Sequence, residues 1–190
     1  SKGIGPKIAQ RLITELREWN ERFNLTAITV PVDMVQKHLL DSLSLQPHLR
    51  GTRIADVGTG AGFPGLPLAV INPKRQFALI EATGKKARFV RHAADVMGLK
   101  NVEVIPTRSE DWRGPVPFDC VATRALGKLA DFVRVAGHLC GPRGRLLAMK
   151  GRHPEFEIAA LPPGWRAVAV HDIRIPGLPA ARCIVELGRA

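Results

Sequence analysis

The chain has 190 residues and a formal net charge of +11, because 28 lysines and arginines stand against 17 acidic residues. This length predicts one domain with at most a small extension, and the longest apolar runs are too short to span a bilayer. Three widely separated cysteines and no visible signal peptide argue against a disulfide scaffold or a metal site and indicate a cytoplasmic protein. The excess of positive charge favours a polyanionic partner such as nucleic acid.

Two helices are predicted in the first part of the chain, which we expect to form an N-terminal helical extension over residues 1–50. Apolar residues recur at helical spacing through residues 4–23, and a second helix is predicted over residues 31–44. His38 and Asp41 lie three residues apart in that second helix and so share a face. Two side chains do not make a metal site, so we interpret them as a structural hydrogen-bonded pair.

A glycine-rich stretch follows the short apolar run at residues 53–57 and precedes a helical apolar pattern, with glycines at positions 58, 60, 62 and 65. Glycine permits a positive φ and lets the backbone approach a ligand closely. This stretch therefore predicts a cofactor loop that includes Gly58 and Gly60. Residues 60–65 match the dinucleotide fingerprint G-x-G-x-x-G, whereas Asp56, two residues before the first glycine, is typical of S-adenosylmethionine enzymes.

The next predicted strand, residues 76–81, ends in Glu81. A carboxylate at that place can accept hydrogen bonds from both ribose hydroxyls of an adenosine. Either cofactor family would use such an acid. Glu81 thus indicates an adenosine-containing ligand without choosing between the two families.

The rest of the chain alternates between strands and helices until its end. Strands are predicted at residues 102–105, 118–123 and 144–149, and helices at residues 83–97 and around 129–139. The last β-rich runs, residues 165–173 and 182–187, have no helix between them and predict a closing antiparallel hairpin. Such a hairpin favours a methyltransferase over a dinucleotide-binding protein. We therefore predict an α/β fold over residues 51–190, the Rossmann-like, doubly wound, seven-stranded sheet of a class I S-adenosylmethionine-dependent methyltransferase.

Ligands of open parallel sheets bind beyond the carboxyl ends of the strands, so the residues there are candidate site residues. After residues 102–105 come Ser109 and Glu110, which either bracket an adenine ring or belong to a solvent-facing loop. Arg124 and Lys150 follow the next two strands, and we predict both as catalytic residues. The amine-binding and cysteine-nucleophile motifs of other base methyltransferases are absent. A nucleophile with a free lone pair, such as guanine N7, needs neither motif, since alignment carries much of the rate.

Four cations lie on the helix predicted over residues 83–97, namely Lys85, Lys86, Arg88 and Arg91. The two lysines stand near the helix N-terminus, where positive charge opposes the macrodipole. RNA phosphates would offset that cost, so the four residues are candidate RNA contacts. A solvated helix face is the other interpretation.

Several segments together resemble the bacterial small-subunit ribosomal RNA methyltransferase G family, also called the glucose-inhibited division protein B family. The similar segments are Asn24-Leu-Thr-Ala-Ile28, His38-Leu-Leu-Asp-Ser-Leu43, residues 56–68 with their Gly-Ala-Gly-Phe-Pro-Gly-Leu-Pro string, residues 85–89, Thr123-Arg-Ala125 and Ala148-Met-Lys-Gly151. They extend over almost the whole chain.

The resemblance implies S-adenosylmethionine-dependent methylation of guanine N7 in 16S rRNA, in a loop near the decoding site. It implies cofactor contacts at Gly58, Phe63, Ser109, Glu110 and Arg124, and Glu81 matches the family's acidic strand end. We expect a monomer whose substrate is 16S rRNA, within the 30S subunit or an assembly precursor. The alternatives are a methyltransferase of another RNA, a protein or a small molecule, and a non-catalytic RNA-binding protein.

Overall fold

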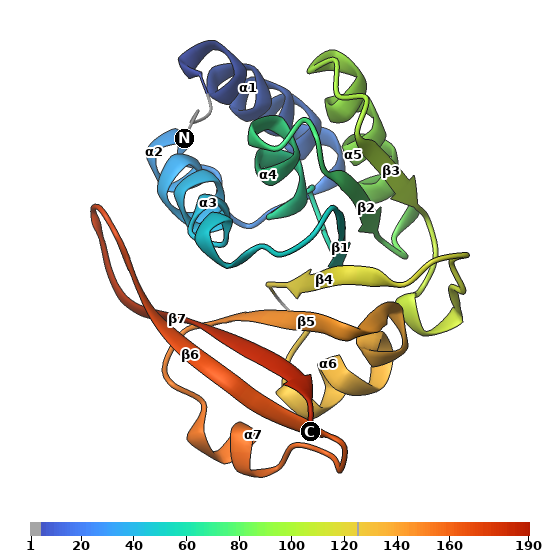
Figure 1. Cartoon of the computed structure of the whole chain (residues 1–190). Coiled ribbons are helices and arrows are strands. Elements are labelled where there is room, and N and C mark those ends of the chain that lie inside the picture. Colours follow the sequence, from blue (N-terminus) through green and yellow to red (C-terminus); the bar gives the residue numbers. More distant parts are fainter. Residues whose placement is uncertain (1–4, 125) are drawn as a thin grey trace.

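A computed structural model describes residues 5–124 and 126–190 as one sheet with helices on both faces (Figure 1). The helices are α1 (Pro6–Phe23), α2 (Pro31–Met34), α3 (Asp41–Leu43), α4 (Gly65–Ile71), α5 (Gly84–Val96), α6 (Leu129–Ala136) and α7 (Glu155–Ala159). A π-helical segment, η1 (Val35–Leu40), joins α2 to α3, and single 3₁₀ turns are η2 (Gln46–His48), η3 (Ser109–Asp111) and η4 (Gly137–Leu139). The strands are β1 (Arg53–Val57), β2 (Gln76–Ile80), β3 (Val102–Ile105), β4 (Phe118–Thr123), β5 (Cys140–Lys150), β6 (Trp165–Ile175) and β7 (Leu178–Arg189).

The strand order is β3-β2-β1-β4-β5-β7-β6. The first five strands are parallel, and β7 runs antiparallel to both β5 and β6. The prediction of a doubly wound, seven-stranded sheet with a closing antiparallel hairpin is confirmed. The order reverses between β1 and β4, so the crevice in which sheets of this kind bind ligands opens beyond the ends of those two strands.

Alternate strand residues supply two hydrophobic clusters, one on each face of the sheet. On one face Ile54 and Phe77 pack with α1, α4 and α5, and on the other Ala55 and Ala78 pack with α6. The period of two along each strand produces this division. Leu16 of α1 lies in the first cluster, so the N-terminal helices and the sheet share one core. The boundary at residue 50 stays a prediction.

The details that differ from the prediction include a π-helical segment, a missing helix and a longer hairpin. The helix expected over residues 31–44 contains the π-helical segment η1, whose i→i+5 hydrogen bonds widen the turn. Only the 3₁₀ turn η3 lies between β3 and β4, so the alternation of strands and helices fails there. The closing hairpin is longer than predicted, because both strands continue to a tight turn at Pro176 and Gly177.

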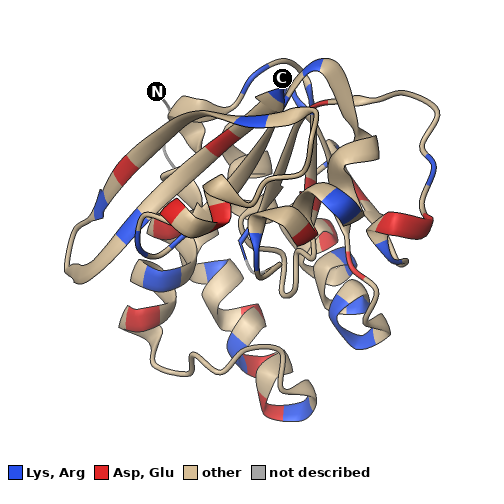
Figure 2. Cartoon of the chain, turned by 90° about the horizontal axis from the view of Figure 1, so that it is seen from below, with Lys and Arg blue, Asp and Glu red and all other residues tan. Residues whose placement is uncertain are grey.

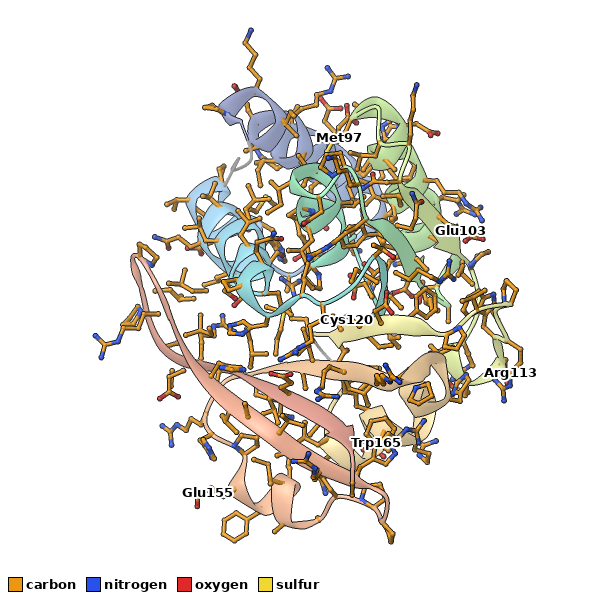
Figure 3. All side chains as sticks on the ribbon, in the orientation of Figure 1. Met97, Glu103, Arg113, Cys120, Glu155 and Trp165 are labelled. Carbon is orange, nitrogen blue, oxygen red and sulfur yellow. The ribbon has the colours of Figure 1, made fainter. Side chains whose placement is uncertain are left out.

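The three cysteines are buried and unpaired thiols. Cys120 lies near the centre of the molecule in Figure 3, where burial raises the pKa of its thiol to about 12. Such a thiol is not nucleophilic near neutral pH, so Cys120 is a core residue. In the described part of the chain, no helix has the length and apolar character needed to cross a membrane.

Candidate cofactor pocket and transfer site

The glycine loop leaves the end of β1 and returns as α4. Gly58, Gly60 and Gly62 have φ angles of 66°, 61° and 95°, a region that residues with a side chain rarely adopt. The Gly58 amide donates to the carbonyl of Ile80 over 2.9 Å, which holds the loop against the end of β2. A Cβ atom on Gly60 would meet no protein atom within 4 Å, so open space lies beside this backbone.

Asp56 shapes the loop from inside. Its Oδ2 accepts hydrogen bonds from the Thr59 hydroxyl at 2.6 Å and from the Gly65 amide at 2.8 Å. The side chain is buried, and burial raises the pKa of its carboxyl to about 6, although both hydrogen bonds and the Arg124 guanidinium act in the opposite direction. A Cβ on Gly65 would come within 2.9 Å of the same oxygen. Asp56 therefore serves as an internal acceptor, and its oxygen together with the Leu79 side chain leaves no room for a Cβ at position 65.

Glu81 links the loop to the end of β2. One carboxylate oxygen accepts from the Gly60 amide at 2.9 Å, and the other accepts from the Thr83 amide at 2.8 Å. A carboxylate has about four acceptor positions, so each oxygen keeps a lone pair for a further donor. This arrangement fits the predicted ribose hydroxyls and adds a role that the sequence did not indicate, the support of the Gly60 backbone.

A cavity of about 200 Å³, the β1–β2 pocket, lies beside these groups. It brings together four predicted cofactor residues, Gly58, Glu81, Ser109 and Glu110. Its other lining residues are Val57, Ile80, Ala82, Thr107, Arg108, Leu126 and Val135. A buried acid beside an apolar wall fits an adenosine, since the acid can bind the sugar and the wall can cover the base.

Ser109 and Glu110 lie in η3 and differ in exposure. Ser109 is buried and its hydroxyl donates to a Glu110 carboxylate oxygen at 3.3 Å. The Glu110 carboxylate points outward, 4.0 Å from the Arg108 guanidinium. The segment is therefore the rim of the β1–β2 pocket, with one residue inside and one at the solvent edge.

Phe63 was implied as a cofactor contact, and in the structure its ring belongs to the core. The ring is 1% exposed and stacks on the His38 imidazole, with centroids 4.5 Å apart and planes 11° apart. It is not among the residues that line the β1–β2 pocket. Its role as a cofactor contact stays a prediction.

Arg124 reaches from the end of β4 to the N-terminal helices. Its Nη1 donates to the Lys37 carbonyl at 3.1 Å and contacts His38 Nδ1 at 3.0 Å. The guanidinium carbon lies 5.6 Å from the centre of the Phe63 ring. Burial lowers the pKa of Arg124, whereas the Asp41 and Asp56 carboxylates raise it. The sequence gives no sign of these contacts, because the partners are more than 80 residues apart.

The predicted pair of His38 and Asp41 is wrong. His38 Nε2 contacts the Thr26 hydroxyl at 3.1 Å, while Asp41 lies 3.6 Å from the Arg182 guanidinium of β7. The reason is the π-helical segment η1, in whose wider turn residues three apart no longer lie above one another. Burial raises the pKa of the Asp41 carboxyl, and Arg182 and Arg124 lower it.

Lys150 is held at the end of β5 by two contacts. Its ammonium donates to the Gly127 carbonyl at 2.6 Å and pairs with a Glu157 carboxylate oxygen at 2.8 Å. The same Glu157 oxygen accepts the Leu129 amide at the start of α6. Glu157, which the sequence analysis missed, thus ties α7 to the loop after β4. The catalytic role of Lys150 stays a prediction.

Arg124 and Lys150 line a second cavity, of about 270 Å³, which we term the β4–β5 pocket. Its other lining residues are Thr123, Leu126, Gly127, Lys128, Leu129, Phe132, Ala148, Met149 and Gly151. Leu126 lines both this cavity and the β1–β2 pocket. The two pockets are therefore neighbours that share one apolar side chain.

The four predicted RNA-binding cations lie along α5. Arg88 and Arg91 are exposed, and Lys85 and Lys86 are half-buried. Among the described residues none of the four pairs with a carboxylate, and the first turn of α5 has no acid. Figure 2 shows that α1, in contrast, carries Lys and Arg interspersed with Asp and Glu. The α5 face is the more favourable surface for a polyanion.

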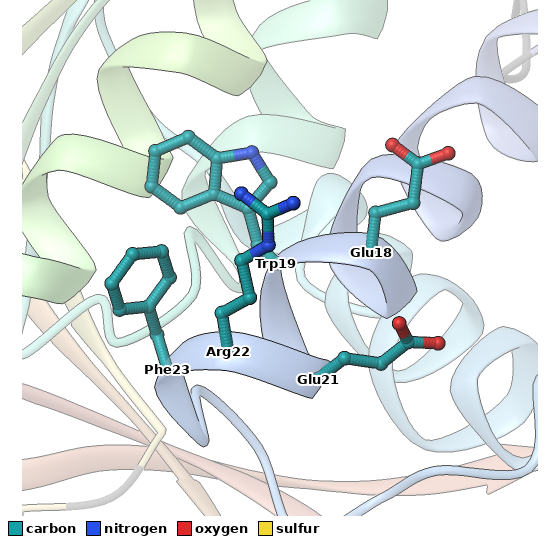
Figure 4. Close-up of a pocket in the computed structure, with 5 residues that line it drawn as sticks. All are labelled: Glu18, Trp19, Glu21, Arg22 and Phe23. Atoms are coloured by element: carbon teal, nitrogen blue, oxygen red, sulfur yellow. The ribbon is translucent and has the colours of Figure 1, made fainter.

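A cavity of about 490 Å³ on α1 lies apart from the predicted site residues. Figure 4 shows Trp19 and Phe23 on one side and the carboxylates of Glu18 and Glu21 on the other, with Arg22 between them. Two acids and one base do not favour an anionic ligand. The ring of Trp19 instead packs on His92 of α5, with centroids 5.0 Å apart.

Comparisons with known proteins agree with this arrangement. A family model described as rRNA small subunit methyltransferase G matches residues 6–185. The ribosomal RNA small subunit methyltransferase G of Aeromonas salmonicida is 46% identical over 93% of this chain and 85% of its own length, and that of Xanthomonas campestris is 48% identical over 92% and 82%.

Solved structures resemble the chain in fold. An S-adenosylmethionine-dependent methyltransferase from Aquifex aeolicus has a TM-score of 0.61 at 19% identity, covering 82% of this chain and 92% of its own. A ribosomal protein L11 methylase from Lactobacillus delbrueckii has a TM-score of 0.60 at 15% identity, covering 79% and 76%. At these identities the likeness concerns the sheet and its helices.

Replacing Asp56 by Asn is expected to change how stability depends on pH. An Asn oxygen can accept the same two hydrogen bonds without a buried charge. The carboxyl has a pKa of about 6 in the folded chain and about 3.9 when unfolded, so its favourable contribution is complete below pH 4 and is lost as the pH rises through 6. Urea unfolding should show the stability of the variant, relative to wild type, rising by up to about 3 kcal/mol between pH 4 and pH 8. A difference between the two proteins that is the same at both pH values would contradict the assignment.

Replacing Glu81 by Gln is expected to weaken binding of S-adenosylmethionine. The amide keeps one acceptor oxygen, so either the Gly60 or the Thr83 amide meets a donor, and the ribose loses a charged acceptor. The loss should be about 1–3 kcal/mol, or roughly 5- to 150-fold in affinity. Calorimetry on both proteins measures it, with the exposed Glu103→Gln as control. Affinity within twofold of wild type would remove Glu81 from the site.

Proposed function

The chain belongs to the rRNA small subunit methyltransferase G family, and from this membership we propose that it methylates N7 of a guanine in 16S rRNA. The observation that supports a transfer reaction most directly is that two pockets lie side by side and share Leu126 as a lining residue. The β1–β2 pocket contains the acid Glu81, and the β4–β5 pocket contains the cations Arg124 and Lys150. The first fits an adenosine-containing methyl donor, and the second fits an anionic substrate.

When bound, S-adenosylmethionine supplies the methyl group: the N7 lone pair forms a bond to the methyl carbon while the carbon–sulfur bond breaks and its electron pair stays on sulfur. No proton leaves N7, so the chain needs no general base there. Its residues have to orient the base, exclude water and tolerate the positive charge that the base acquires. Among the described residues, none that lines the β4–β5 pocket carries a carboxylate, which suits a site that binds phosphate rather than one that removes a proton.

Arg124 is suited to orienting the substrate. Both N–H groups of Nη1 are directed at fixed acceptors, the Lys37 carbonyl and His38 Nδ1. A guanidinium has five N–H donors, and the other three have no hydrogen-bond partner among the described residues. They are available to a phosphate, to the cofactor carboxylate or to acceptor atoms of the base.

The surroundings of the reaction are proposed from charge. A net charge of +11 and a row of cations on α5, none of which pairs with a carboxylate among the described residues, support a substrate with many phosphates. We propose that the enzyme acts as a monomer in the cytoplasm, on 16S rRNA within the 30S subunit or an assembly precursor.

A methylation assay tests the proposed function. Purified enzyme, radiolabelled S-adenosylmethionine and either 30S subunits or free 16S rRNA from a strain lacking this activity should yield label in RNA. Reduction and aniline cleavage should then break the RNA at one guanine. The positively charged ring of an N7-methylated guanine can be reduced, and the chain is cleaved where the reduced base is lost. Label that resists this cleavage would place the methyl group on another atom, and no label in either RNA would reject the proposal.

Reversing charge on α5 is expected to reduce RNA affinity and its salt dependence together. Each phosphate contact contributes about one unit to the slope of log affinity against log salt. Arg88→Glu combined with Arg91→Glu should therefore lower the slope by about two units and leave S-adenosylmethionine affinity unchanged. The matched control reverses Arg143 and Arg166, which are also exposed and lie on β5 and β6. An unchanged slope in the α5 variant would identify these charges as solvated surface.

A further inference from the structure

Two segments of the N-terminal part, residues 24–28 and 38–43, have so far been given no role beyond the acceptor that His38 offers to Arg124. The structure joins them at Arg124. Thr26 from the first segment contacts His38 Nε2 at 3.1 Å, and His38 Nδ1 contacts Arg124 Nη1 at 3.0 Å. A chain of contacts thus runs from the turn after α1, through the π-helical segment, to the mouth of β4.

These contacts determine which ring nitrogen of His38 carries the proton. A guanidinium can only donate, so Nδ1 must present its lone pair to Arg124. The proton is then on Nε2 and is donated to the Thr26 hydroxyl, whose oxygen also accepts the Ile28 amide at 3.1 Å. The neutral ring agrees with its surroundings, since burial and the positive charge of Arg124 lower the pKa of His38 to about 3.

The imidazole cannot easily turn away from this position. It is 3% exposed and lies flat on the Phe63 ring of the glycine loop. The Ser42 hydroxyl binds the His38 carbonyl, and the neighbouring Lys37 carbonyl accepts from the same nitrogen of Arg124. Arg124 therefore has two acceptors, the Lys37 backbone carbonyl and the Nδ1 atom of His38, whose ring is held by packing on Phe63 of the glycine loop.

We propose that His38 is a positioning residue that orients the Arg124 guanidinium for methyl transfer by accepting a hydrogen bond at Nδ1. The inference rests on the proposed function, in which Arg124 contacts the substrate or the cofactor. It gives residues 24–28 and 38–43 a shared purpose: Thr26 selects the tautomer of His38, and His38 selects the direction of Arg124. His38 is not a general base, because its free lone pair already faces a cation.

The test uses single-turnover methylation at saturating RNA and saturating S-adenosylmethionine, on the 16S RNA or 30S substrate that wild type methylates. His38→Phe keeps a flat ring against Phe63 and removes the acceptor. The rate should fall about 10- to 100-fold, the cost expected of a displaced orienting group, while cofactor and RNA affinities stay within about threefold. His38→Asn puts an amide oxygen near the position of Nδ1 and should recover a substantial part of the rate. His38→Gln, whose oxygen reaches towards Thr26 instead, should not.

A double-mutant comparison separates orientation from general packing. Arg124→Ala alone should lower the rate at saturation, and adding His38→Phe to it should lower the rate no further, because the group to be oriented is gone. A second full loss in the double variant would overturn the proposal in favour of a purely structural His38. So would a wild-type rate in His38→Phe.

Two further outcomes keep the test decisive. If Arg124→Ala has the wild-type rate at saturating RNA, the proposed role of Arg124 fails and this inference fails with it, while rRNA methylation by the wild type still stands. If His38→Phe does not fold, Thr26→Val tests the same chain of contacts, since it leaves the ring in place and removes the partner of Nε2. Its rate should fall, and an unchanged rate with wild-type thermal stability would contradict the proposal.

Discussion

The Asp56 carboxylate accepts hydrogen bonds from the Thr59 hydroxyl and the Gly65 amide, and the other features of the site depend on the loop that these two bonds close. The loop turns sharply because its glycines adopt positive φ angles. Burial of the Asp56 charge is unfavourable by itself, and the two hydrogen bonds offset part of this desolvation cost. Because they join Asp56 to Thr59 and Gly65, they also hold the loop in one conformation. Glu81 holds the outer side of the same loop through the Gly60 amide. Asp56 thus holds the loop backbone from within the core, and Glu81 holds it from the side of the β1–β2 pocket.

The conformation of this loop affects the position of Arg124, because Phe63 of the loop packs on His38, which contacts Arg124. The closed loop places Phe63 in the core, where it supports His38, and His38 contacts Arg124 at the end of β4. The N-terminal helices therefore contribute to the site without lining the β1–β2 pocket. Asp41 of the same helical segment pairs with Arg182 of β7, so the closing hairpin is tied to the N-terminal helices at the same level. Three separate parts of the chain, the N-terminal helices, the glycine loop and the end of β4, meet around the Arg124 guanidinium, and a change in any of them can alter its direction.

Positive charge is used in two ways in this molecule. At the mouth of the sheet the cations are partly enclosed and held by named acceptors: Arg124 by the N-terminal helices, and Lys150 by Glu157 and the Gly127 carbonyl. On α5 none of the four cations pairs with a carboxylate among the described residues, and Lys85 and Lys86 lie near the positive end of the helix dipole. Held cations favour a defined geometry, whereas free ones favour long-range attraction of a polyanion. A methyltransferase of a large RNA requires both.

The sequence by itself determined the sheet, the closing hairpin and four of the residues that line the β1–β2 pocket, Gly58, Glu81, Ser109 and Glu110. These features depend on local signals, namely a period of two in the strands, glycines between a strand and a helix, and an acid at a strand end, and parallel strands bring such ends together at one edge. Only the tertiary structure decided the partners of His38, Asp41, Phe63, Arg124 and Lys150. Their contacts join residues far apart in the chain, and the His38–Asp41 prediction failed because η1 departs from α-helical spacing. Residue type and spacing predict where the backbone places a residue. The contacts of its side chain depend on which other elements pack against it, and a single sequence does not show that packing.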